Sequence, residues 1–334
     1  MSDIAKEAGV SVATVSKVLN GSDRVSLETR SRVQELLSER NYERRTGART
    51  DLTPVVDLVL REVSNPWATE IIAGAVEAAK NVHATVAVSV LPDRGGHGSW
   101  LEDIRSRGTR GVIVLLARLS DREKAVLRSR GIPLAVIDPR GERDPSVPTV
   151  GATNWAGAYA ATRHLAELGH KRVGIISGPR DMFCSRTRMD GYRSAMEAAG
   201  LPVDPELMRW GDFHVEVAFK HASTMLSMAN RPTAIFAGSD LQAMGVLEAA
   251  RLLHLPVPTQ LSLVGFDDIP LSRWMSPPLT SVRQPLAEMA ATAVRLVLSH
   301  REVASTKDRS VELATTLVVR ESTAPPPRTV RRAS

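Results

Sequence analysis

Residues 3–42 read DIAKEAGVSVATVSKVLNGSDRVSLETRSRVQELLSERNY, and their spacing predicts three short helices. Ser2 and Asp3 can cap the first helix, Gly9 permits the tight turn that follows, and Ser11 can cap the second helix. Apolar residues recur at helical spacing in all three segments: Ile4, Ala5, Ala8, Val15, Val18, Leu19, Val33, Leu36 and Leu37. Two helices joined by a tight turn, with a third closing the core, are typical of the helix-turn-helix. We expect an all-α headpiece over residues 1–42.

The second helix of such a unit enters the DNA major groove and touches base edges with its first turn. Here Val12, Ala13 and Thr14 form that turn, and Lys17 follows one turn later. Lys17 can donate to guanine, whereas Val12 and Ala13 can only pack on thymine methyl groups. Polar neighbours suit phosphate oxygens, which position a protein without reading sequence. The candidate phosphate contacts are Ser11, Thr14 and Ser16, and Asn20 is a further candidate DNA contact. The alternative is a small helical cap with solvated Ser and Lys side chains.

Residues 43–53, ERRTGARTDLT, are polar and basic and predict a linker. Beyond Pro54 the pattern changes, because apolar runs of strand length alternate with amphipathic stretches of helix length. The runs are 54–60, 84–91, 111–116, 133–138, 172–178, 233–238 and 261–268. Continuous Val/Ile/Leu strands separated by helices indicate parallel sheets covered on both faces. Since the series restarts near Asn154, we expect an α/β core of two doubly wound lobes facing a cleft over residues 54–323.

Composition narrows the function classes. Apolar residues make up 43% and charged residues 24% of the 334 residues, which excludes wholesale disorder. Lys and Arg number 43 against 37 Asp and Glu, so an anionic partner is permitted but not required. No apolar stretch could span a membrane, and MSDIAKEAG lacks the apolar run of an export signal, so we expect a cytoplasmic protein. The single cysteine, Cys184, predicts neither an internal disulfide nor a metal site. Residues 324–334, with three prolines and three arginines, predict a disordered tail.

The headpiece stretch resembles the DNA-binding domain of LacI-type (LacI/GalR family) transcriptional repressors. The remainder is similar to the family's periplasmic-binding-protein-like core, through HLAELGHKRVGIISG, CSRTRMDGYRSAMEAAG, PTAIFAGSDLQAMG, LVGFDDIP and PPLTSVRQP. The resemblance implies a homodimer that reads a near-palindromic operator, with a small-molecule effector in the interlobe cleft. It also implies an N-lobe of about 54–153 and 285–315, and a C-lobe of about 154–284 and 316–323. Val12, Ala13 and Lys17 occupy its base-reading positions.

The linker departs from the family pattern. The family's hinge usually carries a leucine that wedges into the minor groove, but here Leu52 stands only near the end of the segment. Arg44, Arg45 and Arg49 are candidates to enter a narrow minor groove instead, because such grooves attract arginine. The alternative for these three residues is a solvated run of charge.

Candidate ligand contacts follow the predicted strands, because parallel α/β sheets bind ligands at the carboxyl ends of their strands. Aromatic faces stack on sugar rings, and carboxylates and arginine bind sugar hydroxyls. By position we select Asn65, Trp67, Asp138, Asp240, Asp267 and Trp274. The family resemblance supports Asp267 and adds Arg188, Phe213 and Ser239. We also expect Cys184 and Ser185 near the cleft, with a buried, inert cysteine as the alternative for Cys184. Asp240 could instead cap a helix, Trp67 could anchor a lobe, and Asp138 could be a turn residue beside Pro139.

Enzymatic signatures are absent from the sequence. There is no phosphate-binding loop, no nucleophile elbow and no HExxH pair, so we expect no enzyme, cofactor or metal. Two other classes stay open: an α/β enzyme with a helical appendage, and a two-lobed sugar-binding protein. The expected function is repression of transcription, modulated by a sugar or oligosaccharide. The motifs are also similar to those of actinobacterial regulators of plant-polysaccharide sugars, with β-xylosides as one candidate effector and purines or other hydroxylated metabolites as others.

Overall fold

The computed structural model describes residues 2–19, 25–39, 53–91, 99–299 and 310–327. The chain divides into two compact units, residues 1–52 and 53–334. Within the described ranges, no helix is both long and apolar enough to cross a bilayer.

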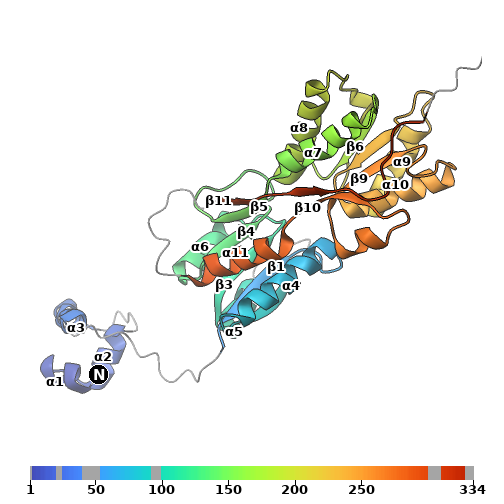
Figure 1. Ribbon diagram of the computed structural model, residues 1–334. Helices are drawn as coiled ribbons and strands as arrows, with labels where there is room; N and C mark the ends of the chain where they lie inside the picture. Colours follow the sequence, from blue (N-terminus) through green and yellow to red (C-terminus); the bar gives the residue numbers. More distant parts are fainter. Residues whose placement is uncertain (1, 20–24, 40–52, 92–98, 300–309, 328–334) are drawn as a thin grey trace, which may run out of the picture. The chain divides into compact units, whose positions relative to one another are not determined.

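The described part of the N-terminal unit contains three helices: α1 (Ser2–Glu7), α2 (Val12–Leu19) and α3 (Leu27–Glu39) (Figure 1). Gly9 adopts a φ of +64°, the left-handed conformation that the tight turn requires. The Ser11 hydroxyl accepts a hydrogen bond from the backbone N–H of Thr14 at 3.2 Å, as expected of a helix cap. Six side chains form a small buried core: Ile4, Ala5, Ala8, Val15, Val18 and Val33. The predicted helix-turn-helix is confirmed.

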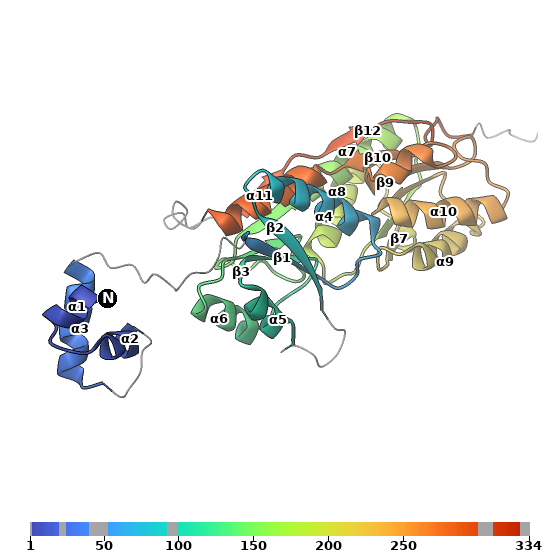
Figure 2. The same ribbon diagram turned by 90° about the horizontal axis from the view of Figure 1, so that it is seen from below.

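The second unit contains two six-stranded sheets, and we call the part built on each sheet a lobe. The N-lobe sheet is entirely parallel in the order β11-β5-β4-β3-β1-β2. Its strands are β1 (Val55–Leu60), β2 (Thr85–Val90), β3 (Thr109–Leu115), β4 (Leu134–Ile137), β5 (Thr149–Ala152) and β11 (Ser310–Leu313). One face is covered by α4 (Pro66–Lys80) and α11 (Leu286–Leu298), and the other by α5 (Ser99–Arg107) and α6 (Asp121–Ser129) (Figure 2).

The C-lobe sheet has the order β12-β10-β9-β8-β6-β7, and only β12 runs antiparallel to its neighbour. Its strands are β6 (Val173–Ser177), β7 (Met208–Trp210), β8 (Ala234–Ala237), β9 (Ser262–Asp267), β10 (Thr280–Arg283) and β12 (Thr316–Val318). Helices α7 (Asn154–Glu167) and α8 (Phe183–Ala198) cover one face, and α9 (Val215–Leu226) and α10 (Asp240–Leu252) cover the other. Two 3-10 turns, η1 (Pro205–Leu207) and η2 (Pro270–Trp274), complete the lobe.

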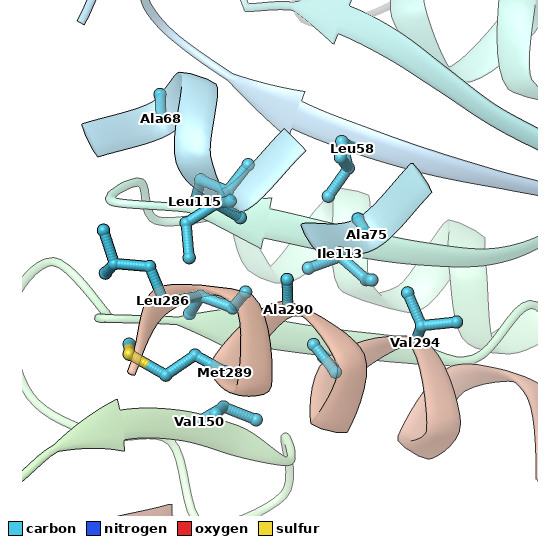
Figure 3. Packing of buried hydrophobic residues seen from close by; sticks show 14 of the residues in the cluster. Leu58, Ala68, Ala75, Ile113, Leu115, Val150, Leu286, Met289, Ala290 and Val294 are labelled. Atoms are coloured by element: carbon cyan, nitrogen blue, oxygen red, sulfur yellow. The ribbon is translucent and has the colours of Figure 1, made fainter. Parts of the chain in front are cut away.

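Dense apolar packing fixes each helix on its sheet. In the N-lobe, Ala75 of α4 and Ala290 of α11 meet the side chains of Leu58 and Ile113 from the sheet (Figure 3). The two helices approach so closely that a Cβ on Gly74 would lie 2.6 Å from the Cα of Ala287. Because protein interiors have few voids, this contact leaves no room for a side chain at position 74.

Three crossovers join the lobes: β5 to α7, β10 to α11, and β11 to β12. Two of them are bonded to each other, since the Thr153 hydroxyl lies 3.0 Å from that of Thr315 and accepts the Thr315 backbone N–H at 2.9 Å. This bonding holds Thr153 and Thr315, which are far apart in the sequence, side by side at the junction of the lobes.

All seven predicted strands are present, and five further strands are not among those predicted: β5, β7, β10, β11 and β12. The predicted start of a disordered tail at Ala324 is wrong. The Ala324 carbonyl accepts hydrogen bonds from His170 and from the Ser262 hydroxyl, each at 2.9 Å, so this end of the chain is bound to the C-lobe. Residues 328–334 lie outside the described residues.

Candidate functional site

The exposed face of α2 carries the predicted DNA contacts. Val12, Ala13 and Lys17 are exposed, Val12 to 46%, while Val15 and Val18 are buried in the headpiece core. The hydroxyls of Ser11 and Thr14 lie 2.9 Å apart at the start of the helix. The Ser16 side chain, Asn20, Arg44, Arg45 and Arg49 lie outside what the structure describes.

A pocket with residues from both lobes brings together most of the predicted ligand contacts. The empty space at this pocket, with the open solvent at its mouth included, is about 350 Å³. Seven of its nine lining residues are those predicted, and the other two are Leu116 and Cys184. The predicted lining residues are Asn65, Trp67, Asp138, Arg188, Phe213, Ser239 and Asp267. We call this the effector pocket.

Arg188, on α8, is the cation of the effector pocket, and it is buried. Its Nε donates to Oδ1 of Asn154 at 2.8 Å, and its Nη1 donates to the Gly238 carbonyl at 2.5 Å. The guanidinium also lies 3.7 Å from the ring centre of Phe266. Among the residues that the structure describes, Nη2 has no hydrogen-bond acceptor. A held guanidinium with one unused nitrogen suits a ligand oxygen.

Two buried carboxyl groups line the same pocket as this guanidinium. Burial raises the pKa of Asp138 to about 6, although the charge of Arg188 opposes the rise. Burial likewise raises the pKa of Asp267 to about 7, and Arg188 and a hydrogen bond from Gln284 at 2.6 Å oppose it. The Asp267 carboxylate lies 3.8 Å from Nη1 of Arg188. Perturbed carboxyl groups that converge in a cleft are a common mark of a functional site.

Backbone strain is concentrated at the same place. Seven described residues other than glycine have positive φ, and four of them line the effector pocket. The four are Leu116 (48°), Asp138 (46°), Phe213 (69°) and Asp267 (109°). Such conformations cost about 1–3 kcal/mol each and persist where the surrounding structure requires them, often at ligand sites.

Helix starts and close packing position the remaining lining residues. Asn65 caps α4 by accepting the Trp67 N–H at 2.9 Å, and Ser239 caps α10 by accepting the Gln242 N–H at 3.1 Å. The Phe213 ring packs on Gly178, where a Cβ would lie only 2.1 Å from the ring.

Two predicted ligand contacts do not line the effector pocket. Trp274 lies on η2 with 80% of its surface exposed, because the 3-10 turn directs it outward. Asp240 is buried, and its carboxylate accepts the Ile269 N–H at 2.9 Å and the Ser281 hydroxyl at 2.5 Å. It therefore ties α10 to the strands beside it, and Ser239 rather than Asp240 is the helix cap. Burial raises the Asp240 pKa well above its usual range.

Cys184 and Leu116 line the pocket but were not among the predicted contacts. Burial raises the pKa of the Cys184 thiol to about 12, so the group stays protonated and unreactive. Within the described ranges, no group of three or more His, Cys, Asp or Glu side chains could hold a metal ion.

Comparison with known proteins agrees with this geometry. Residues 1–45 match the model for bacterial regulatory proteins of the lacI family, and residues 162–323 match the periplasmic binding protein-like domain. The chain is 32% identical over 332 residues to the HTH-type transcriptional repressor CytR of Escherichia coli (strain K12), covering 97% of this chain and 96% of that protein.

Two solved structures extend the comparison. The transcriptional regulator CelR–cellobiose complex is 32% identical with a TM-score of 0.73, covering 96% of this chain and 98% of that one. The lac repressor dimer bound to operator and the anti-inducer ONPF is 26% identical with a TM-score of 0.70, at the same coverage. Together the helix-turn-helix, the two-lobed core and these matches over nearly the whole chain place the protein in the LacI family of bacterial transcriptional regulators.

Proposed function

We propose that the protein is a homodimeric transcriptional repressor that binds a near-palindromic operator and whose operator affinity is modulated by a sugar in the effector pocket. The observation that carries the ligand part is the arrangement around Arg188. A buried guanidinium with an unused nitrogen lies 3.8 Å from the Asp267 carboxylate and lines the same pocket as the buried carboxyl group of Asp138, on whose pKa its charge acts. Sugar hydroxyls both donate and accept hydrogen bonds, so one ring can satisfy both kinds of group.

The aromatic residues support the same ligand class. The Phe213 ring centre lies 5.6 Å from the Arg188 guanidinium, and Trp67 lines the same pocket. An aromatic face packs on the apolar face of a sugar ring while polar groups bind its edge. The cellobiose complex of CelR is consistent with this class, although it concerns a different protein.

The coupling follows from the division of the pocket between the lobes. Asp138 lies at the end of β4 in the N-lobe, whereas Arg188 and Asp267 belong to the C-lobe. A ligand that bonds to both lobes favours the arrangement in which their groups converge. A coupling of about 1–3 kcal/mol changes operator affinity roughly 5- to 150-fold. Two headpieces of a dimer would read half-sites about one helical turn apart.

The test begins by selecting operators from a random duplex library with the full chain, followed by fluorescence anisotropy with and without sugars. A thermal-shift panel of sugars and nucleobases identifies the effector, since a bound ligand raises the midpoint of unfolding. Arg188→Ala should retain operator binding and lose the ligand response. Arg193→Ala, an exposed position on the same helix, is the matched control. A chain that selects no two-fold-symmetric duplex, or an Arg188→Ala variant with unaltered effector affinity in calorimetry, would refute the proposal.

A further inference from the structure

A second hollow lies where the lobes join, apart from the effector pocket. It has about 510 Å³ of open space. Its lining comes from the β5–α7 crossover, from the first two turns of α8, and from β11. The lining residues are Ala152, Thr153, Asn154, Trp155, Ala156, Phe183, Thr187 and Glu312. None of them lines the effector pocket, and we call this the crossover hollow.

The crossover hollow presents aromatic faces beside hydrogen-bonding groups. Trp155 is 46% exposed and stacks on Tyr159 with ring centres 5.1 Å apart, so its indole is held against α7. Phe183 has the Arg143 guanidinium 4.3 Å from its ring centre. Phe183 is only partly exposed, so the indole of Trp155 is the ring surface that suits the apolar face of a ring-shaped ligand.

The polar groups of the hollow offer both acceptors and donors. Glu312 brings carboxylate oxygens, and the Thr187 hydroxyl donates to the carbonyl of Phe183 at 3.0 Å, which leaves its lone pairs free to accept. The Thr153 hydroxyl bonds to Thr315 and makes no hydrogen bond to the first turn of α7. The first backbone N–H groups of that helix therefore remain available as donors.

The charge balance favours a neutral ligand. The Glu312 carboxylate is already ion-paired with Arg143, and no other lining residue is charged. A charged ligand would compete with that pair, whereas hydroxyl groups can bond to it without disturbing the charges. Hydroxyl groups also suit the mixture of acceptors and donors in the hollow, because each hydroxyl can both donate and accept a hydrogen bond.

One hydrogen bond joins the two cavities. Asn154 lines the crossover hollow, and its Oδ1 accepts the Arg188 Nε at 2.8 Å while its Nδ2 donates to the Ala152 carbonyl at 3.0 Å. The guanidinium of the effector pocket is thus bonded to the segment that leads from one lobe into the other. A change at the crossover can reach Arg188 through Asn154.

We propose that the crossover hollow is a second small-molecule site, which binds a neutral hydroxylated ring such as a sugar, and that its occupancy changes the effector pocket through Asn154 and Arg188. The site is separate from the proposed effector site, although the change in effector affinity presupposes that the effector pocket binds a ligand. A ligand there would contact both lobes at their junction.

The first experiment counts sites by calorimetry on the full chain, using glucose, xylose, cellobiose and xylobiose as probes. In Arg188→Ala, which disables the effector pocket, at least one probe should still bind once per chain. Adding Ala156→Phe, which fills the hollow from an exposed helical position, should abolish that binding, whereas Ala198→Phe on α8 should not. Absence of binding to Arg188→Ala, or binding that survives Ala156→Phe, would overturn the proposal.

The second experiment needs only the effector pocket. Ala156→Phe in the otherwise native chain should shift the effector dissociation constant by about 5-fold or more, and Ala198→Phe should leave it unchanged. An unchanged constant in both variants would refute the link through Asn154. If Arg188→Ala does not fold, the sites are counted in the native chain instead. The native chain should then bind two ligands, and Ala156→Phe should reduce this number to one. Neither experiment uses DNA, so a failure of the chain to bind an operator would appear only in the operator-binding assays and not in these results.

Discussion

Replacing Asp138 by asparagine tests whether the effector pocket holds a carboxyl group at a measurable cost to stability. Burial raises the Asp138 pKa from 3.8 to about 6, a difference of about 2 units. Since one unit corresponds to 1.36 kcal/mol, the charged form is disfavoured in the folded protein by about 3 kcal/mol. Asparagine has nearly the same shape and carries no charge at any pH.

The pH dependence has a definite sign. A carboxyl group whose pKa is higher in the folded state binds its proton more tightly there, so its contribution favours folding at low pH. That contribution is complete below pH 3.8 and is lost as the pH rises to about 6. The free energy of unfolding of the native chain, minus that of Asp138→Asn, should therefore fall by about 3 kcal/mol between about pH 3.5 and pH 7.

Urea unfolding of both chains at a series of pH values measures this difference. Titrating groups remote from Asp138 contribute equally to both chains and cancel. The exception is Asp267, because the charge of Asp138 raises its pKa and Asp138→Asn removes that effect. Asp103→Asn, at an exposed carboxyl group outside the effector pocket, is the matched control. A difference between native and Asp138→Asn chains that stays constant across this pH range would refute the argument from burial.

Three further predictions concern other parts of the molecule. Lys17→Ala should weaken operator binding by about 1–3 kcal/mol and leave effector affinity unchanged, and unaltered binding in gel shifts would contradict the base contact. Gly178→Ala should displace the Phe213 ring, because the new Cβ would lie 2.1 Å from it, and calorimetry should show weaker effector binding with operator binding retained. Trp274→Ala should leave effector affinity unchanged, since the side chain is 80% exposed and outside the pocket; a clear loss in calorimetry would return Trp274 to the site.

Local sequence signals were sufficient for the headpiece and for the central strands. Gly9 and Ser11 act on their own neighbours, so the turn and the helix cap follow from the residues themselves. Central parallel strands are buried on both faces and appear as continuous apolar runs, as β3 and β9 do. The short strands β7 and β12 are only partly buried and have no such run, because their positions depend on pairing with distant segments.

Residues of the effector pocket could be predicted from sequence where they stand at the carboxyl end of a parallel strand, because ligands of α/β sheets bind there. Asp138 follows β4 and Asp267 ends β9, and parallel α/β sheets bind ligands at the carboxyl ends of their strands. That rule does not specify side-chain direction. Asp240 begins a helix beside a strand end, yet its carboxylate turns toward Ile269 and Ser281 instead of the cavity.

Apolar lining residues are harder to identify from sequence. Leu116 ends a buried strand and Cys184 lies in a helix, so both have the pattern of core residues. Their exposure to a cavity is a property of the assembled lobes. Trp274 shows the opposite error. Its place near a strand end predicts a ligand contact, but the sequence does not indicate where the 3-10 turn directs its ring.

The effector pocket lowers the stability of the folded chain, and the groups responsible are also those through which a bound ligand can change the arrangement of the lobes. Buried carboxyl groups at Asp138 and Asp267 and left-handed backbone at four lining positions all disfavour the folded chain. These groups oppose one another across the lobes, with Asp138 on one side and Arg188 on the other. A ligand that donates to the carboxylates and accepts from the guanidinium reduces that cost only while the lobes hold these groups together. It therefore has different affinities for different lobe arrangements, which is the condition for a ligand to shift a conformational equilibrium.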